Sequence, residues 1–370
     1  MDWPSVTVII LGWRENNALR RCLKSIAEAH NDTPSEIVLV LNGAESLVRV
    51  VAQEHTGDLR LVESPVNLGF GGGCNLGASG STARYLLFLN DDTEVPDGWI
   101  DGLVAAAEAD ERVAAVGCLL VNANGEVEEL GASITPEGWG SQHHRRERLE
   151  QLVVPDAPFP TDYCSAAALL VRREAFESVQ GFDPRYHPAY FEDLDLCVAL
   201  LHRGWTTVCQ PAVTITHYGG LSSDSTFRAF LGRRNHQAFV DKWSWPAATP
   251  TPWDEEGGPA GPAELRHLRL DVLVHRDYTR ELRQRLEELE SLELHPVVSD
   301  LTSQRDEACR ALNEARVRIA HDHATLEDLS ARLERFQAHI DGLHALVQHQ
   351  EAQLRRRWTS RLASRLQVRR

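Results

Sequence analysis

Two adjacent aspartates follow a short apolar run of the chain. Asn90-Asp91-Asp92 comes directly after Tyr85–Leu89 (YLLFL), whose composition predicts a buried strand. Two carboxylates at the end of a buried strand are costly unless something cationic compensates them. A hard divalent cation is commonly held by one or two carboxylates, with phosphate and water completing its shell. The alternative is a capped turn, in which Asp92 caps the element that follows.

A second acidic group lies further along the chain, in the segment 191–196 (FEDLDL). Glu192, Asp193 and Asp195 precede a helical pattern of leucines, and acids in a first turn are favoured by the helix dipole. Capping requires only one or two of them. A carboxylate here could instead act as a general base, if it reaches a substrate hydroxyl.

His217 follows the apolar run 212–215 and stands just before two glycines. A histidine at the end of a strand can be a metal ligand or a general acid or base. The chain has 16 histidines, and a single histidine is more often structural, so both interpretations stay open from the residues alone.

A glycine-rich run, NLGFGGGCN, occupies residues 67–75. Four glycines before a helix allow the backbone to approach a phosphate or a sugar closely. The run is not a dinucleotide-binding fingerprint, because Cys74 stands in place of the third glycine. It is not a P-loop either, since no Gly-Lys-Ser/Thr follows it.

The elements that must position these residues alternate between strands and helices. The pattern predicts strands at 6–11, 36–41, 59–63 and 85–89, and helices at 17–29, 44–54 and 73–80. Such alternation is typical of an α/β fold with a mostly parallel sheet and helices on both faces. In these sheets ligands bind beyond the carboxyl ends of the strands, which is where the acidic and glycine-rich motifs fall.

Taken together in this order, the motifs resemble glycosyltransferase family 2, the inverting enzymes of the Rossmann-like GT-A fold. The resemblance covers about residues 5–245 and is closest to the rhamnosyltransferase-like branch. Three segments carry it most clearly: 67–77 (NLGFGGGCNLG), 85–99 (YLLFLNDDTEVPDGW) and 167–205, which contains FEDLDL.

The resemblance implies a role for each motif. Asp92 would hold Mg²⁺ or Mn²⁺ on the diphosphate of a nucleotide-sugar donor, and His217 would complete the metal shell. Asn90 and Asp91 would belong to the donor site, with Asp91 near the ribose or sugar. Asp193 would be the catalytic base, and Glu192 would support the acceptor site.

The resemblance also implies a nucleotide-binding surface, made up of Trp13, Glu15, Asn42, Gly71, Gly72 and Asn75. One departure from the family bears on it. After the second strand the family usually has Asp-Asn-x-Ser, whose aspartate contacts the base, whereas this chain has LNGA at residues 41–44. Asn42 is the substitute, and the identity of the nucleotide stays open.

The implied activity is metal-dependent, inverting transfer of a sugar, rhamnose or another hexose or deoxyhexose, in cell-surface polysaccharide synthesis. The acceptor would be a glycan or a lipid-linked glycan. We favour dTDP-rhamnose as donor, with UDP-hexose and UDP-galactofuranose as alternatives. A scaffold with a catalytically weak transferase domain is a different hypothesis. A nucleotidyltransferase would need a basic, glycine-rich triphosphate loop, which residues 12–17 do not supply.

Composition narrows the class of protein further. The chain has 370 residues with 42% hydrophobic and 25% charged residues, as in soluble globular proteins. Residues 1–261 carry 19 basic and 36 acidic groups, which argues against nucleic-acid binding. No basic region precedes the apolar run at 6–11, and the seven cysteines form no CxxC pair. These features predict a cytoplasmic protein.

Prolines and glycines concentrate near residue 250 and divide the chain. We expect a GT-A domain at 1–247, a linker at 248–261 and a helical coiled-coil region with an arginine-rich tail at 262–370. Apolar residues recur every seven positions in this last region: Leu312, Ile319, Leu326, Leu333, Ile340, Val347 and Leu354. This repeat predicts self-association or a helical partner through 297–357, within one chain or between chains.

The last sixteen residues, 355–370, hold seven arginines and no acid. With Trp358, Leu362 and Leu366 at helical spacing, they could form an amphipathic segment in peripheral contact with the inner face of the cell membrane. A solvated helix end is the alternative.

Overall fold

The computed structural model describes residues 5–14, 17–55, 57–219 and 225–245, together with Val274, Tyr278 and Leu282. The chain divides into two units, Met1–His267 and Leu268–Arg370. The predicted linker, the heptad segment 297–357, the arginine-rich segment 355–370 and Glu15 lie outside the described residues. Within the described part of the chain, no helix is long and apolar enough to cross a membrane.

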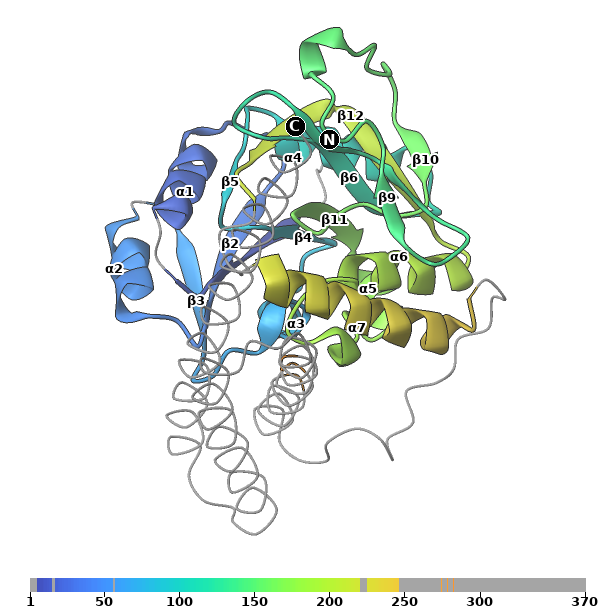
Figure 1. Cartoon of the computed structure of the whole chain (residues 1–370). Helices are drawn as coiled ribbons and strands as arrows, with labels where there is room; N and C mark the ends of the chain where they lie inside the picture. The colour runs from blue at the N-terminus through green and yellow to red at the C-terminus, as the bar shows by residue number, and fades with distance from the viewer. Residues whose placement is uncertain are drawn as a thin grey trace, which may run out of the picture. The chain divides into compact units, whose positions relative to one another are not determined.

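The first ninety residues follow the predicted alternation of strands and helices (Figure 1). The elements are β1 (Val6–Gly12), α1 (Ala18–Glu28), β2 (Ser35–Asn42), α2 (Ser46–Glu54), β3 (Leu59–Ser64), α3 (Gly69–Ala78) and β4 (Tyr85–Leu89). Their ends agree with the prediction to within two residues, except that α3 begins at Gly69 rather than at Gly73. The glycine-rich run is therefore mostly helix.

The described residues of the first unit beyond β4 add eight strands, four α-helices and two short 3₁₀-helices. They are β5 (Thr93–Glu94), α4 (Trp99–Glu108), β6 (Val113–Val121), β7 (Val127–Leu130), β8 (Ala132–Ile134), β9 (Gly140–Gln142), η1 (Leu149–Gln151), β10 (Phe159–Thr161), β11 (Ala168–Arg172), α5 (Arg173–Ser178), η2 (Pro184–Tyr186), α6 (Glu192–His202), β12 (Thr206–His217) and α7 (Ser225–Trp243).

The main sheet is mixed rather than mostly parallel. Its strand order is β10-β12-β6-β11-β4-β1-β2-β3, with β5 paired to β12 and β7 to β6. The pairs β4-β1, β1-β2 and β2-β3 are parallel, as predicted, and β6-β12 is parallel as well. β11 is antiparallel to both of its neighbours, β4 and β6. The sequence analysis did not predict this antiparallel strand. The composition of a buried run such as Ala168–Arg172 does not indicate the direction in which the strand runs.

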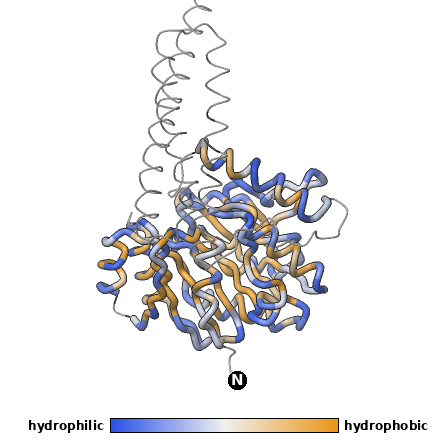
Figure 2. The backbone as a smooth tube through the Cα atoms, turned by 90° about the horizontal axis from the view of Figure 1, so that it is seen from below, coloured by the Kyte–Doolittle hydropathy of each residue, from blue (hydrophilic) through white to orange (hydrophobic). Residues whose placement is uncertain are grey.

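Helices cover both faces of this sheet, as the alternation predicted. Alternate residues of β1 point to opposite faces, as the pleat requires. Val8 and Ile10 pack with α1, α2 and α4, whereas Ile9 packs with residues of α3, α5 and α6. Figure 2 shows the hydrophobic residues concentrated in the strands between these helix layers. The core therefore holds the strands rigidly, and with them the residues at their ends.

Candidate active site

The carboxyl ends of the parallel strands lie at one edge of the sheet. β6 runs parallel to β4 because both are antiparallel to β11, and β12 runs parallel to β6. The ends of β1, β2, β4, β6 and β12 therefore point the same way. Asn90-Asp91-Asp92 follows β4, and His217 ends β12. β5 and β12 pair directly, with His217 opposite Thr93, so the sheet itself brings Asp92 and His217 together.

Asp92 and His217 face each other at this edge. Oδ1 of Asp92 lies 3.2 Å from Nε2 of His217, and the side-chain nitrogen of Asn90 lies 3.2 Å from the same Nε2. The backbone N–H of Tyr218 donates to the carbonyl of Asp92 at 2.9 Å, which fixes the turn. The three polar side chains predicted for the metal and donor site thus meet around one imidazole nitrogen. Asp91 is half-buried in the same turn.

The other nitrogen of His217 contacts a residue that the sequence analysis missed. Oε2 of Glu128, on β7, lies 2.6 Å from Nδ1. Burial alone would lower the pKa of His217, but the carboxylates of Asp92 and Glu128 raise it to about 10. Histidines that bind metals commonly donate their second N–H to such a carboxylate, which fixes the ring and leaves the first nitrogen for the metal.

These residues fit a divalent cation of the kind that nucleotides carry. Oδ1 of Asp92 is buried and makes no well-formed hydrogen bond within the described residues. In the described part of the chain, no group of three or more His, Cys, Asp or Glu side chains is arranged to hold a metal alone. One carboxylate and one imidazole suit an ion whose remaining ligands are phosphate and water. The ion would supply neutralisation of charge on a departing diphosphate.

Asp193 lies at the start of α6, over the same edge. Its carboxylate accepts hydrogen bonds from the backbone N–H of Leu194 at 2.8 Å and of Ala166 at 3.3 Å. Asn90 N–H in turn donates to the carbonyl of Ala167 at 2.9 Å. The short stretch before β11 therefore connects Asp193 to Asn90, next to the predicted metal site. Burial raises the pKa of Asp193 above its usual value, which suits a base.

The backbone before Asp193 is strained and is held from α7. Tyr190 and Phe191 both have φ of 77°, in the left-handed region. Such conformations persist only where the surroundings impose them, and they gather at functional sites. The side chain of Asn235, fully buried on α7, donates to the carbonyls of Ala189 at 2.9 Å and Tyr190 at 2.8 Å. α7 thus fixes the turn from which Asp193 projects, a role the sequence analysis did not foresee.

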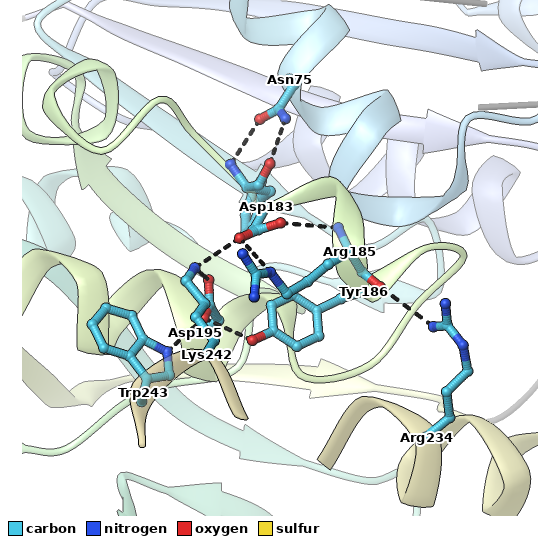
Figure 3. A network of polar contacts seen from close by, with 9 residues as sticks. Asn75, Asp183, Arg185, Tyr186, Asp195, Arg234, Lys242 and Trp243 are labelled. Atoms are coloured by element: carbon cyan, nitrogen blue, oxygen red, sulfur yellow. Dashed lines mark hydrogen bonds and ion pairs between the residues drawn. The ribbon is translucent and has the colours of Figure 1, made fainter. Parts of the chain in front are cut away.

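The other two acids of this helix start have different neighbours from Asp193. Asp195 belongs to a buried polar network with Lys242 and Trp243 (Figure 3). Glu192 is buried near α3, where the Cβ of Glu192 lies 3.8 Å from the position a Cβ on Gly71 would take. Oε2 of Glu192 makes no hydrogen bond within the described residues, and burial raises its pKa well above the usual value. An acceptor-site role for Glu192 stays a prediction.

Most residues predicted for the nucleotide make contacts within the protein. Asn42 accepts from Leu68 N–H at 2.7 Å and donates to Gly69 O at 3.0 Å, so it ties β2 to the start of α3. Both ends of the Asn75 amide bond the backbone of Phe182, at 2.8 and 2.9 Å (Figure 3).

Gly71 and Trp13 also have positions that bear on the predicted nucleotide surface. A Cβ on Gly71 would lie 2.9 Å from the Cβ of Phe182. Packing of α3 therefore explains this glycine, and Gly72 is half-buried beside it. Trp13 is half-buried just after β1, with the Arg14 guanidinium 4.1 Å from its ring centre. A contact of Trp13 with a nucleotide base stays a prediction.

The fold is GT-A-like, a mixed sheet with helices. A structure of GalNAc-T7 with UDP, GalNAc and Mn²⁺ superposes with a TM-score of 0.52 at 15% identity, over 70% of this chain and 49% of that one. Residues 7–179 match the sequence model of glycosyl transferase family 2. Residues 7–179 are thus similar to family 2 domains, and the chain is a glycosyltransferase.

Two bacterial relatives are similar along most of the chain. The N-acetylglucosaminyl-diphospho-decaprenol L-rhamnosyltransferase of Mycobacterium tuberculosis is 27% identical over 312 residues, covering 76% of this chain and 97% of that protein. The O-antigen biosynthesis protein RfbC of Myxococcus xanthus is 27% identical over 357 residues, covering 85% of this chain but 26% of that protein. The resemblance to the rhamnosyltransferase-like branch is thus confirmed at the level of similarity.

Proposed function

We propose that the chain transfers a sugar, rhamnose as the first candidate, from a nucleoside-diphosphate donor to a lipid-linked glycan, with inversion at the anomeric carbon. The observation that carries this is the meeting of Asp92 and His217 at one sheet edge, with Asp193 held over that edge through Ala166. The name of the mycobacterial relative supports both the sugar and the lipid-linked acceptor.

The arrangement assigns the steps to this chain's own residues. Asp92 and His217 would hold Mg²⁺ or Mn²⁺ with the donor diphosphate, and Glu128 would keep the imidazole oriented. Asp193 takes the proton from an acceptor hydroxyl while that oxygen bonds to the anomeric carbon. The bond from this carbon to the diphosphate oxygen breaks at the same time, from the opposite face. One displacement of this kind needs a base and no enzyme nucleophile.

The C-terminal predictions complete this proposal. The heptad segment 297–357 would associate with another helix, and the arginines of 355–370 would hold the enzyme at an anionic membrane surface, where a lipid-linked acceptor lies. The membrane contact is tested with a chain that ends at Gln353. That variant should lose salt-sensitive binding to anionic liposomes, and equal binding by both forms would remove the membrane part.

Calorimetric titration tests the donor site. dTDP, UDP and GDP are each titrated into the full chain with and without Mn²⁺, and into the Asp92→Ala variant. We expect one nucleotide to bind only with metal and to bind at least about tenfold more weakly to the variant. Asp156→Ala, which removes an exposed acid on the loop before β10, is the matched control and should bind as the wild type does. Absence of binding by every nucleotide would favour the scaffold hypothesis.

A further inference from the structure

Glu129 is a buried acid that the proposed mechanism does not use. It lies on β7, next to Glu128, and its side chain is 2% exposed. Its Oε1 accepts a hydrogen bond from the backbone N–H of Ser165 at 2.8 Å. Its Oε2 is buried and makes no hydrogen bond within the described residues. An ionised carboxylate with one hydrogen bond costs more free energy in such a place than the protonated acid does.

The hydrogen bond places Glu129 beside the base. Ser165 N–H binds Glu129, and the next amide along the chain, Ala166 N–H, binds Oδ2 of Asp193 at 3.3 Å. The side chain of Ser165 also contacts Asp193. Two consecutive amides before β11 therefore hold two carboxyl groups, one from β7 and one from α6. Any movement of Ser165 displaces the amide that orients Asp193.

The surroundings of Glu129 favour its neutral form. Burial, the largest effect, and the charge of Asp193 raise the pKa of Glu129 to about 8, against the opposing effects of the Ser165 N–H hydrogen bond, His217 and Arg145. The remaining titratable groups around it are Tyr163, Cys118, Cys164 and Cys197, and burial raises the pKa of Tyr163, Cys118 and Cys197 above their usual values. His217 and Arg145 supply positive charge near Glu129, but burial outweighs their effect on its pKa.

We propose that Glu129 is a positioning residue that works as an un-ionised carboxylic acid, fixing the Ser165–Ala166 segment and so aiming Asp193 at the acceptor hydroxyl. The inference rests on the proposed role of Asp193 as base. Being neutral, Glu129 supplies a hydrogen-bond acceptor without placing a second negative charge beside that base. Two carboxyl groups in one site commonly divide in this way, one ionised and one protonated.

Turnover of two variants tests the positioning. Glu129→Gln keeps the volume and the acceptor oxygen, and Glu129→Ala removes the acceptor. With the donor identified by titration, we expect E129A to lose at least about tenfold in kcat, with the KM for the donor changed less than about twofold. E129Q should rescue most of this loss and leave the acid limb of the pH profile in place. A lower pKa for that limb in E129Q would mean that Glu129 is charged, and would overturn the proposal.

Thermal unfolding and amide hydrogen exchange test the role of Glu129 without any turnover, so they are independent of the proposed function. A raised folded-state pKa means that the acid stabilises the fold fully below its unfolded pKa and loses that contribution as pH rises to about 8. The Tm of E129Q should therefore rise relative to wild type between pH 5 and 8, in EDTA, and then level off. Amide hydrogen exchange at residues 165–166 should be faster in E129A than in E129Q.

The outcomes are distinct. Suppose the wild type transfers no sugar, while the Tm difference and the exchange pattern are as expected. The proposed function is then wrong, but Glu129 is still a neutral acid that holds the Ser165–Ala166 segment. A constant Tm difference, or equal exchange in both variants, overturns the inference. If E129A fails to fold, Glu129→Asp replaces it, because the shorter side chain withdraws the acceptor from Ser165.

Discussion

Asp193 and Asp195 lie two residues apart on α6, yet their surroundings are opposite. Asp195 is 2% exposed and accepts hydrogen bonds from Lys242 at 2.6 Å, Trp243 at 2.7 Å and Tyr186 at 2.8 Å (Figure 3). Asp193 is half-buried and faces no cation within hydrogen-bonding distance among the described residues; its bonds come from backbone amides and Ser165.

The difference indicates that Asp195 stabilises the fold, whereas the carboxylate of Asp193 is available for chemistry. Lys242 compensates the charge of Asp195 and ties α7 to α6 and to Asp183, which it contacts at 2.8 Å. Backbone amides orient Asp193 without neutralising it, so the carboxylate keeps the capacity to accept a proton. The same contrast predicts that substitutions at the two positions fail in different ways.

The largest effect is expected for Asp193→Asn. The amide cannot take a proton, so kcat should fall by roughly 10²- to 10⁴-fold, the usual contribution of a general base. Metal-dependent nucleotide binding should stay within about twofold of wild type. Steady-state kinetics and calorimetry on the same preparation check both. A variant that retains full turnover would show that another group is the base.

Asp195→Asn should instead destabilise the protein. Lys242 would lose one of its two carboxylate partners, and breaking a buried pair by removing one member typically costs about 3–5 kcal/mol. Because Asp183 remains beside Lys242, we expect a value near the lower end. Urea unfolding measures the change, and the folded fraction should still bind nucleotide with metal. Unchanged unfolding together with lost turnover would reverse the roles assigned to the two aspartates.

A smaller effect is expected for Glu128→Gln. Loss of the carboxylate that orients His217 should weaken Mn²⁺ binding in the presence of nucleotide by about tenfold, as is common for such supporting contacts. Glu150→Gln, which alters an exposed acid, is the control. Equal Mn²⁺ affinity in the two variants would mean that Glu128 does not orient His217 for a metal.

Local patterns explain which parts of this fold could be predicted from sequence. The first four strands are apolar runs bounded by turn residues, so their ends, and the acids that follow them, are visible in the chain. The direction of β11 is not, because it depends on pairing with β4 and β6, which lie far away in sequence. That pairing is also what made the sheet mixed.

In the candidate site, residues that belong to motifs in a fixed order could be predicted from the sequence. Residues that belong to the site only through contacts with distant parts of the chain could not. Asp92 and His217 were identified from motif order, and the structure brings them together. Glu128 and Glu129 were missed because β7 is four residues long (VEEL) and reads as an ordinary polar stretch. Asp193 and Asp195 look equivalent in FEDLDL. They are distinguished by partners such as Lys242, which lies 47 residues beyond Asp195.

The most direct test of single displacement assisted by Asp193 is the anomeric configuration of the product. The full chain is incubated with Mn²⁺, the nucleotide sugar selected by titration and a lipid-linked N-acetylglucosaminyl diphosphate, and the product is examined by NMR. Single displacement predicts that the wild type forms a new glycosidic bond with the configuration opposite to that of the donor. Asp193→Asn should form little of this product. A product with retained configuration would contradict single displacement assisted by Asp193.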